Sequence, residues 1–483
     1  MEELMKKWLF FTLLIIKSLF LAPHLSYANS THSKQNECIE IFDQLIFHDI
    51  VYLGYCNIGD EDISDLLSKL ENYPEIQTLI LMNNNIGSEG AKKLAKQLVL
   101  TDLYLDSNHV TDDAAVEISN NPHFRVISLD DNQITDVGAQ ALVNNNPLLE
   151  YLDLGNNIKI TAKSLANLKN HPTLDSLYIN DINLGDAIAD TLIENHKITT
   201  LAVSNTNMTD IGIRKIATHE EYIVLYLGGN QVTLPSLNAL NQNSNLQYLA
   251  LNNTKMDDGS AALLSFHPSA RGFYFDNNKI GAKGAAYLSA NPRLVELSIN
   301  NNPLGDKGAM WLAKSRSITS LYADKTNISS DGAIALAKNH HLFELSLNEN
   351  NIRDDGASAF AQNRYLSRLY MSKNKVGDKG SALFGKNTKL THLILDHNEI
   401  RNEGAIGLAR NRTLMILDVS YNHIGAEGLK ALADNKYIPV IYTIGNDGKM
   451  NSNLVFEAVK KSCTKKHSRV CTKLEKWENQ AQE

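Results

Sequence analysis

Side chains that could support catalysis are abundant in this sequence, which contains 15 histidines, 54 acidic residues and 4 cysteines among 483 residues. None falls into a catalytic spacing: there is no HExxH, no P-loop, no GxSxG and no CxxC. Several histidines instead follow predicted helix ends, where a cation complements the helix dipole, at His171, His196, His219 and His340. The acidic residues recur at a fixed period, so neighbouring carboxylates would reflect stacking. The sequence therefore predicts no enzyme, no catalytic residues, no cofactor and no metal site.

Tyrosines offer a different chemistry, because they recur at a constant interval, at Tyr178, Tyr226, Tyr274, Tyr322 and Tyr370. Asp276 and Asp324 lie two residues after Tyr274 and Tyr322. Asp396 lies at the equivalent place in another repeat. A tyrosine combines a large apolar ring with a polar tip, which suits protein interfaces and sugar stacking. These eight residues are the candidate partner-binding residues. The alternative is that tyrosine is a good strand former inherited by duplication of a 48-residue unit, and that the aspartates are only solvated.

A repeat explains these intervals. The pattern L-x-L-x-x-N-x-I occurs at residues 103–110, 127–134, 273–280 and 345–352. Its asparagine slot falls at 56, 84, 108, 132, 157 and 182, and then at strictly equal steps at 206, 230, 254, 278, 302, 326, 350, 374, 398, 422 and 446, which gives seventeen repeats. Periods of roughly 20 to 29 residues with this signature describe a leucine-rich-repeat array.

Each repeat begins with a short strand whose alternating apolar residues, such as Leu225 and Leu227, must point inward. The asparagine that follows can satisfy buried backbone groups where the chain turns away from the sheet. Cys56, Thr206, Thr254 and Thr326 occupy this slot in four repeats and can do part of that work. Ile182 cannot, so we expect its turn to be the weakest.

The second half of each repeat predicts a helix. An acidic residue four positions after the slot should cap the first helical turn, as at Asp112, Asp136, Asp186, Asp210, Asp258, Asp306, Asp354 and Asp378. A small-residue and leucine run then forms the helix, as at residues 308–315 and 332–339, with Leu312 and Leu336 in the core. Prolines at 122, 147, 172, 268 and 292 stop several helices before the next strand.

These motifs resemble the ribonuclease-inhibitor-like class of leucine-rich repeats, and specifically the GALA-type repeats of bacterial secreted effectors, over about residues 51–448. The resemblance implies an α/β solenoid (horseshoe) with a parallel concave sheet, convex helices and about 17 repeats, mostly of roughly 24 residues each. GALA-type proteins often carry an F-box, for which residues 29–50 are too short. Many unrelated partners bind this architecture, so the resemblance indicates the fold more than the function.

The predicted sheet should be about 80 Å long, because strands stack about 4.8 Å apart. Tyrosines on every second strand would then place rings about 9.6 Å apart, with shallow pockets over Ala202, Ala250, Ser298 and Ser346 between them. This face would be aromatic and mildly acidic, which favours a basic protein segment or a hydroxyl-rich glycan. The net charge of −8 offers no basic face for nucleic acid.

The N-terminus predicts a signal peptide over residues 1–28, because Lys6 and Lys7 precede an apolar run and Ser26-Tyr27-Ala28 resembles a cleavage site. Met5 is an alternative start, and a membrane anchor is the alternative reading, but the apolar run is short for a span and is broken by Lys17. We therefore expect no stable membrane span after cleavage. The remaining predicted parts are an N-terminal cap (29–50), the repeat array (51–448) and a C-terminal helical cap (449–483).

The four cysteines form two terminal pairs, Cys38 with Cys56 and Cys463 with Cys471. An exported chain can oxidise such pairs into disulfides that staple the caps, and free buried thiols are the alternative. The sequence leaves this choice open, and Cys56 is the less secure partner because it also occupies the asparagine slot.

We expect a non-enzymatic protein-binding scaffold, exported from a bacterial cell to the periplasm or beyond, including into a host cell. Its expected partner is a protein, including a host protein, bound on the concave Tyr/Asp face. One alternative is a periplasmic or surface protein that binds envelope glycan. Another is an effector that acts as a ubiquitin-ligase adaptor or a GTPase regulator.

Overall fold

The computed structural model describes residues 36–447. The chain divides into two compact units, Met1–Leu246 and Gln247–Glu483, which we describe separately. The predicted signal peptide with its alternative start, the Cys463–Cys471 pair and the C-terminal cap lie outside the described residues. Among residues 36–447, no helix is both long and apolar enough to cross a membrane.

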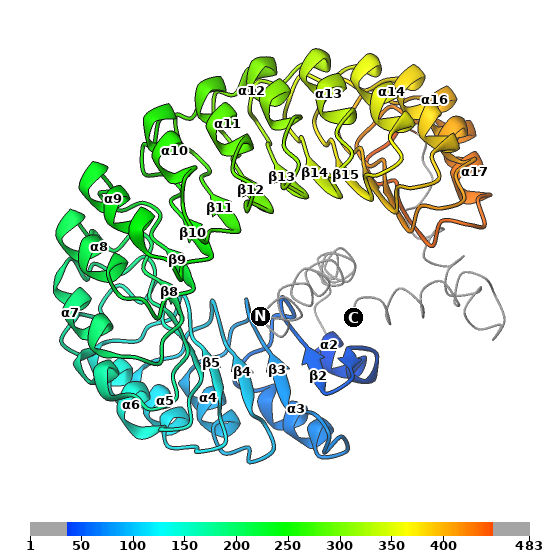
Figure 1. Ribbon diagram of the computed structural model, residues 1–483. Helices are drawn as coiled ribbons and strands as arrows, with labels where there is room; N and C mark the ends of the chain where they lie inside the picture. The colour runs from blue at the N-terminus through cyan, green and yellow to red at the C-terminus, as the bar shows by residue number, and fades with distance from the viewer. Residues whose placement is uncertain (1–35, 448–483) are drawn as a thin grey trace. The chain divides into compact units, whose positions relative to one another are not determined.

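The strands of the first unit form one sheet in chain order (Figure 1). They are β1 (Ile46–Phe47), β2 (Ile50–Tyr52), β3 (Thr78–Ile80), β4 (Asp102–Tyr104), β5 (Val126–Ser128), β6 (Tyr151–Asp153), β7 (Ser176–Tyr178), β8 (Thr200–Ala202) and β9 (Val224–Tyr226). β1 is antiparallel to β2, whereas β2 to β9 are all parallel to their neighbours. Each parallel strand therefore represents one repeat.

The second unit continues the same pattern with nine parallel strands. They are β10 (Tyr248–Ala250), β11 (Gly272–Tyr274), β12 (Glu296–Ser298), β13 (Ser320–Tyr322), β14 (Glu344–Ser346), β15 (Arg368–Tyr370), β16 (His392–Ile394), β17 (Ile416–Asp418) and β18 (Val440–Tyr442). Neighbouring strands pair in the register that the repeat predicts, so Leu297 lies beside Leu321 and Leu321 beside Leu345. The described residues thus contain the seventeen repeat strands that the sequence predicts.

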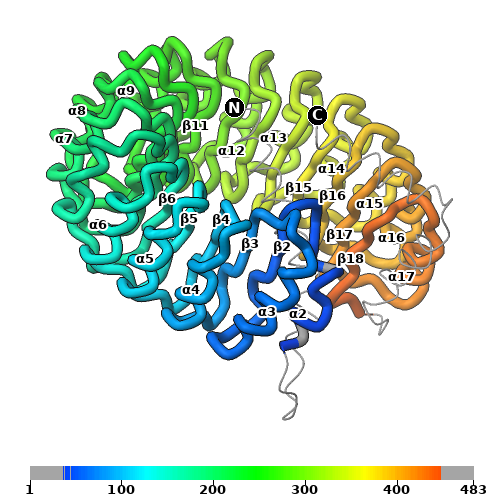
Figure 2. Tube along the Cα trace, turned by 90° about the horizontal axis from the view of Figure 1, so that it is seen from below, coloured from blue at the N-terminus to red at the C-terminus, as the bar shows by residue number. Residues whose placement is uncertain are grey.

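One helix follows most strands, and in each unit the helices lie on the outer side of the arc that the strands trace (Figure 1). Figure 2 shows the resulting stacked turns. In the first unit the helices are α2 (Glu37–Glu40), α3 (Ile63–Leu70), α4 (Ser88–Leu94), α5 (Asp112–Ser119), α6 (Asp136–Asn145), α7 (Ala187–Glu194), α8 (Asp210–Ala217) and α9 (Leu234–Gln242), with the 3₁₀ turns η1 (Phe42–Gln44) and η2 (Ala166–Asn170). In the second they are α10 (Asp258–Leu264), α11 (Ala282–Ser289), α12 (Gly305–Leu312), α13 (Ser330–Ala337), α14 (Asp354–Gln362), α15 (Asp378–Leu383), α16 (Asn402–Leu408) and α17 (Ala426–Ala433), with η3 (Phe384–Lys386).

The core lies between the strand layer and the helix layer. The inward strand residues Leu225 and Leu227 are fully buried, and Leu312 and Leu336 are buried on the helical side of their own repeats. Leucine side chains alternate with outward residues because strand side chains point to opposite faces. This confirms the predicted α/β leucine-rich-repeat solenoid.

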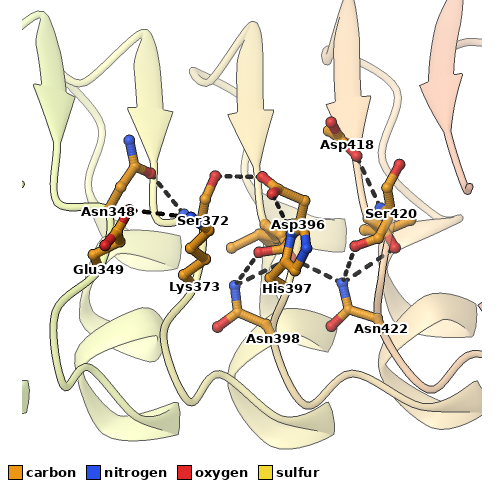
Figure 3. A network of polar contacts seen from close by, with 12 residues as sticks. Asn348, Glu349, Ser372, Lys373, Asp396, His397, Asn398, Asp418, Ser420 and Asn422 are labelled. Carbon is orange, nitrogen blue, oxygen red and sulfur yellow. Dashed lines mark hydrogen bonds and ion pairs between the residues drawn. The ribbon is translucent and has the colours of Figure 1, made fainter. Parts of the chain in front are cut away.

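The asparagine slot joins each turn to the one before it. The Asn302 amide nitrogen donates to its own Ile299 carbonyl (3.1 Å) and to the preceding Phe275 carbonyl (2.8 Å). Its amide oxygen accepts from the preceding Ile280 N–H (2.9 Å). The same pattern recurs at Asn398, whose nitrogen is drawn in Figure 3. One amide thus satisfies buried backbone groups of two repeats, as the sequence predicts in part.

Threonine in this slot makes fewer of these bonds. Thr326 Oγ1 donates to the Ala323 carbonyl of its own repeat (2.7 Å). It does not make the bonds to the preceding repeat that a slot asparagine such as Asn302 makes. Ile182 is fully buried and has no polar group to offer. That its turn is the weakest stays a prediction.

The helix-capping carboxylates act between repeats, which corrects the expectation that each caps its own helix. Asp306 Oδ1 accepts from Ser329 N–H (2.7 Å) and Gly332 N–H (3.0 Å), both at the start of the next helix, α13. A Cβ atom at Gly332 would lie 2.7 Å from that oxygen. Glycine at this position therefore lets the neighbouring carboxylate reach the helix, and Gly138 meets Asp112 in the same way.

A second asparagine ladder, which the sequence analysis missed, follows the helices. Asn339 Nδ2 donates to the Ala313 and Ser315 carbonyls of the preceding repeat (2.9 and 2.8 Å), and its oxygen accepts from Leu342 N–H (2.9 Å). Asparagines at the ends of the helices, repeated at the period of the array, carried this signal. The same donor bonds to the preceding repeat recur at Asn121, Asn146, Asn195, Asn243, Asn363, Asn387, Asn411 and Asn435, whereas the Asn291 amide nitrogen is buried without a partner among the described residues.

The described part of the first unit starts with α2, η1 and β1. A disulfide joins Cys38 in α2 to Cys56, with the two Cα atoms 5.9 Å apart. Asn36 Nδ2 also donates to the Cys56 carbonyl (2.9 Å), so the turn that lacks an asparagine is fastened from the N-terminal side.

Replacing Asn302 with leucine should destabilise the protein by about 3–5 kcal/mol, because it leaves backbone groups of a buried turn unpaired. The matched control is Asn302→Thr, since threonine fills this slot at Thr254 and Thr326 and keeps one of the bonds. Urea unfolding of the full chain measures both variants. Equal losses of stability would show that the amide is not the stabilising group.

Candidate functional site

The five candidate tyrosines lie on the strand face that points away from the helices. Tyr178 and Tyr226 belong to the first unit, and Tyr274, Tyr322 and Tyr370 belong to the second. All five are half-buried. In the second unit the strand register places Ser298 and Ser346 between them, one strand apart. The structure therefore brings the predicted tyrosine columns to the predicted face of each unit.

The shallow pockets expected between the rings are closed. Ala202 is 1% exposed, and Ala250, Ser298 and Ser346 are buried as well. In the first unit the ring centroids of Tyr178 and Tyr226 lie 6.2 Å apart. This is closer than the separation of about 9.6 Å that two strand spacings predict. Side chains on the inner side of a curved sheet converge, so the phenol rings lean together over the small residue that separates them.

The first tyrosines of the same column are not accessible. Tyr52 and Tyr104 are buried, and they pack with Ile80 and Val126 in an apolar cluster on the strand face. The ring of Tyr151, next to this cluster, contacts that of Tyr178 with the centroids 5.1 Å apart and the planes tilted by 35°. The strand face of the first unit is therefore largely self-covered.

The candidate aspartates carry structural bonds. Asp324 Oδ1 accepts from Ser346 Oγ (2.6 Å) and from Asn348 N–H (2.7 Å) on the next strand. Two repeats earlier in the chain, Asp276 Oδ1 likewise accepts from Ser298 Oγ (2.7 Å) and from Asn300 N–H (2.8 Å). Burial raises the pKa of both carboxyl groups.

Asp396 lies in the same column with a different set of partners (Figure 3). It accepts from Ser372 Oγ, and the side chain of His397 lies 2.8 Å from its other oxygen. The column thus works as a hydrogen-bonded ladder across strands, in which Asp324 and Asp396 each use both carboxylate oxygens.

Two carboxylates beside the tyrosines were missed from the sequence. Glu296 and Glu344 stand directly before the first inward leucine of β12 and β14, and both are half-buried. Tyr274 Oη donates to Glu296 Oε1 (2.9 Å), and Arg368 Nη1 lies 3.3 Å from Glu344 Oε2. Their spacing in the sequence, equal to that of the tyrosines, was the available signal.

Tyrosines and glutamates therefore alternate on the strand face of the second unit. β12 and β14 carry glutamate, while β11, β13 and β15 carry tyrosine. Burial raises the pKa of Tyr322, and the negative charges of the nearby Glu344 and Glu296 raise it further. The phenol therefore stays a neutral hydrogen-bond donor. We call Tyr274, Tyr322, Tyr370, Glu296 and Glu344 the Tyr/Glu strip.

Comparisons with known proteins bear on the fold. Leucine-rich-repeat family models match residues 340–400 and, as single repeats, residues 76–95, 120–143, 194–217, 290–313 and 410–433. Among solved structures, an internalin from Listeria monocytogenes strain 4b F2365 is similar, with 21% sequence identity over 79% of this chain and 93% of that chain and a TM-score of 0.39. No curated protein matches.

The repeat matches and the strand register together define the class: the chain is a leucine-rich-repeat protein with a solenoid fold.

Acidic residues at the self-covered end of the first unit give a pH prediction. Burial, opposed by bonds from Ser128 and the Asp130 N–H, raises the pKa of Asp106 to about 6, from an ordinary value of 3.8. The native state therefore binds this proton more tightly than the unfolded state, so Asp106 costs stability in full above pH 6, and this cost shrinks as the pH falls and is lost below pH 3.8.

Asp106→Asn should accordingly raise the free energy of unfolding at pH 7 by about 1–2 kcal/mol, after allowance for partial exposure, and leave it nearly unchanged at about pH 3, below the unfolded-state pKa. Urea unfolding from about pH 3 to 8 measures the difference. Asp131→Asn, an exposed carboxylate in the same region, is the control and should change stability little at any pH. An Asp106→Asn effect that is independent of pH would contradict the assignment.

Proposed function

We propose that this protein is a non-enzymatic, exported scaffold that binds a protein partner on the strand face of its second unit, through the Tyr/Glu strip. In the second unit, Asp276, Asp324 and Asp396 border the strip. In the first unit, Tyr178 and Tyr226 form a further proposed partner-binding surface. The supporting observation is that half-exposed tyrosines and carboxylates alternate at a fixed spacing on one hydrogen-bonded sheet.

The chemistry of the strip favours a segment with basic side chains. Tyrosines dominate binding energy at interfaces because they bury a large ring and lose little conformational entropy. Carboxylates between them attract lysine and arginine, although Arg368 partly neutralises Glu344. The sheet holds these groups in place before binding, which lowers the entropy cost of association.

A glycan is less well matched to this surface. Sugar stacking needs an accessible ring face, whereas Tyr178 and Tyr226 are tilted against each other by 36° and the small residues between tyrosines are covered. We also propose that the chain is exported, acts in a host cell and belongs to the GALA-type subclass. The predicted leader at residues 1–28 supports export, and the small-residue helical motifs, as at residues 332–339, support the GALA-type subclass.

A peptide display library selected on the full chain tests the proposal. We expect enrichment of lysine- and arginine-containing peptides, because the strip is acidic and aromatic. The triple variant Tyr274→Ala, Tyr322→Ala and Tyr370→Ala should weaken the best peptide by more than about a hundredfold, since each hot-spot tyrosine contributes about 1–2 kcal/mol. Isothermal titration calorimetry measures the affinities.

The control is Tyr287→Ala, which removes an exposed tyrosine on the outer helix α11 and should leave affinity unchanged. Circular dichroism checks that the triple variant is folded. Selection of acidic or purely apolar peptides, or binding that survives the triple substitution, would contradict the proposal. Binding to a polysaccharide array in the absence of peptide binding would instead favour the glycan alternative.

A further inference from the structure

Three potential metal ligands meet on the first unit, in the loops that follow α7 and α8. His196 follows α7, and His219 and Glu221 follow α8 one repeat later. His196 Nδ1 lies 3.0 Å from Glu221 Oε1, and His219 Nδ1 lies 3.4 Å from Glu221 Oε2. One ligand atom from each residue lies within 4.8 Å of the other two.

The protonation of His219 is constrained by its second nitrogen. His219 Nε2 lies 3.1 Å from the Asn195 carbonyl, which can only accept a hydrogen bond, so Nε2 carries a proton. In the neutral ring Nδ1 then presents a lone pair to a carboxylate. Two acceptors that face each other require a cation between them or an additional proton, on the ring or on the carboxyl group.

Equivalent histidines in other repeats show a different arrangement. His171 Nδ1 accepts from Leu174 N–H (3.2 Å) and His267 Nδ1 accepts from Ala270 N–H (3.1 Å), each three residues ahead in the chain. Within residues 36–447, no backbone N–H bonds to Nδ1 of His219. This ring nitrogen is directed to Glu221 instead, so the helix-end role does not account for it.

The distances suit a small divalent metal ion. Zn²⁺ binds histidine nitrogen and carboxylate oxygen at about 2.0–2.2 Å in a tetrahedron, which separates neighbouring ligand atoms by about 3.3 Å. The separations of 3.0 and 3.4 Å are close to this value, but they involve the two different oxygens of Glu221, and the shorter one is a hydrogen bond. Because the three ligand atoms lie within 4.8 Å of one another, binding requires the exposed His196 and Glu221 side chains to turn toward the ion. Imidazole ligands favour Zn²⁺ and similar metals over Ca²⁺ and Mg²⁺, which prefer oxygen alone.

The burial of His219 and its contact with the Asn195 carbonyl complete the arrangement. The His219 side chain is only 7% exposed, whereas those of His196 and Glu221 are 68% and 37% exposed. The Asn195 carbonyl orients His219, as carbonyls do for many metal-binding histidines. The exposed side leaves room for the ion to enter and for water as a fourth ligand.

We propose that His196, His219 and Glu221 form a Zn²⁺ site that links two neighbouring repeats. The sequence predicted no metal site, because these ligands come from two different repeats and match no zinc motif. The site is independent of the Tyr/Glu strip. Bound Zn²⁺ would fasten the loop after α7 to the loop after α8 and stabilise this part of the first unit.

Titration of the full chain with Zn²⁺ in a calorimeter tests the proposal. We expect one binding event that is weakened more than about a hundredfold by His196→Ala, by His219→Asn or by Glu221→Gln, because losing a direct ligand should cost at least as much as losing a residue that only orients a ligand. His219→Asn should remain folded, since Asn195 and Asn243 occupy the same position in adjacent repeats. Zn²⁺ should also raise the unfolding temperature of the wild-type chain but not that of the variants.

The matched control is His340→Ala. His340 occupies the repeat position of His196, but the next repeat carries Asn363 and Tyr365 where His219 and Glu221 would stand. Its Zn²⁺ affinity should equal that of the wild type. The absorption spectrum of the Co²⁺-loaded chain provides a second test. We expect the bands of a Co²⁺ ion bound by histidine and carboxylate, without thiolate bands. Zn²⁺ affinity that is unchanged in the three ligand variants, or a Co²⁺ spectrum with thiolate bands that persist in them, would overturn the proposal.

Discussion

The structure depends on satisfying the backbone groups of turns that lie inside it. Each repeat leaves the sheet through a buried turn, where water cannot reach the peptide groups and an unpaired one is costly. The slot asparagine solves this for two repeats at once, because its amide bonds to its own strand and to the turn before it, as Asn302 does. This requirement keeps the strand and its slot at a constant separation through the array.

Two further ladders connect the same neighbours. Carboxylates such as Asp306 bond to the first turn of the following helix, and asparagines such as Asn339 bond to the preceding helix end. All three ladders lie at the turns or on the helical side. In the second unit the strand face carries structural bonds mainly through Asp276, Asp324 and Asp396, so it can also carry the Tyr/Glu strip on a rigid support.

The sequence predicted well what lies within one repeat and less well what lies between repeats. Strand positions, inward leucines and the asparagine slot follow from periodicity, because burial on one face imposes the pattern. The partner of the Asp306 carboxylate, the closure over Ala202 and the meeting of His196 with Glu221 depend on how neighbouring turns are displaced and tilted. Glu296 and Glu344 recur at the spacing of the tyrosines, but glutamate is common at surfaces and does not stand out in a sequence. The repeat period predicts which residues lie side by side in the sheet, but it does not predict the direction in which their side chains point.

Three intervals between slots are longer than the others: those from 56 to 84, from 132 to 157 and from 157 to 182. Asn84 nevertheless bonds to Leu53 and Ile58, and Asn157 bonds to Leu129 and Ile134, as in repeats of normal length. The additional residues are accommodated outside the strand and the slot, for example around the ten-residue helix α6. The strand face can therefore diversify only by substitution, whereas the helical side can also gain or lose residues during evolution.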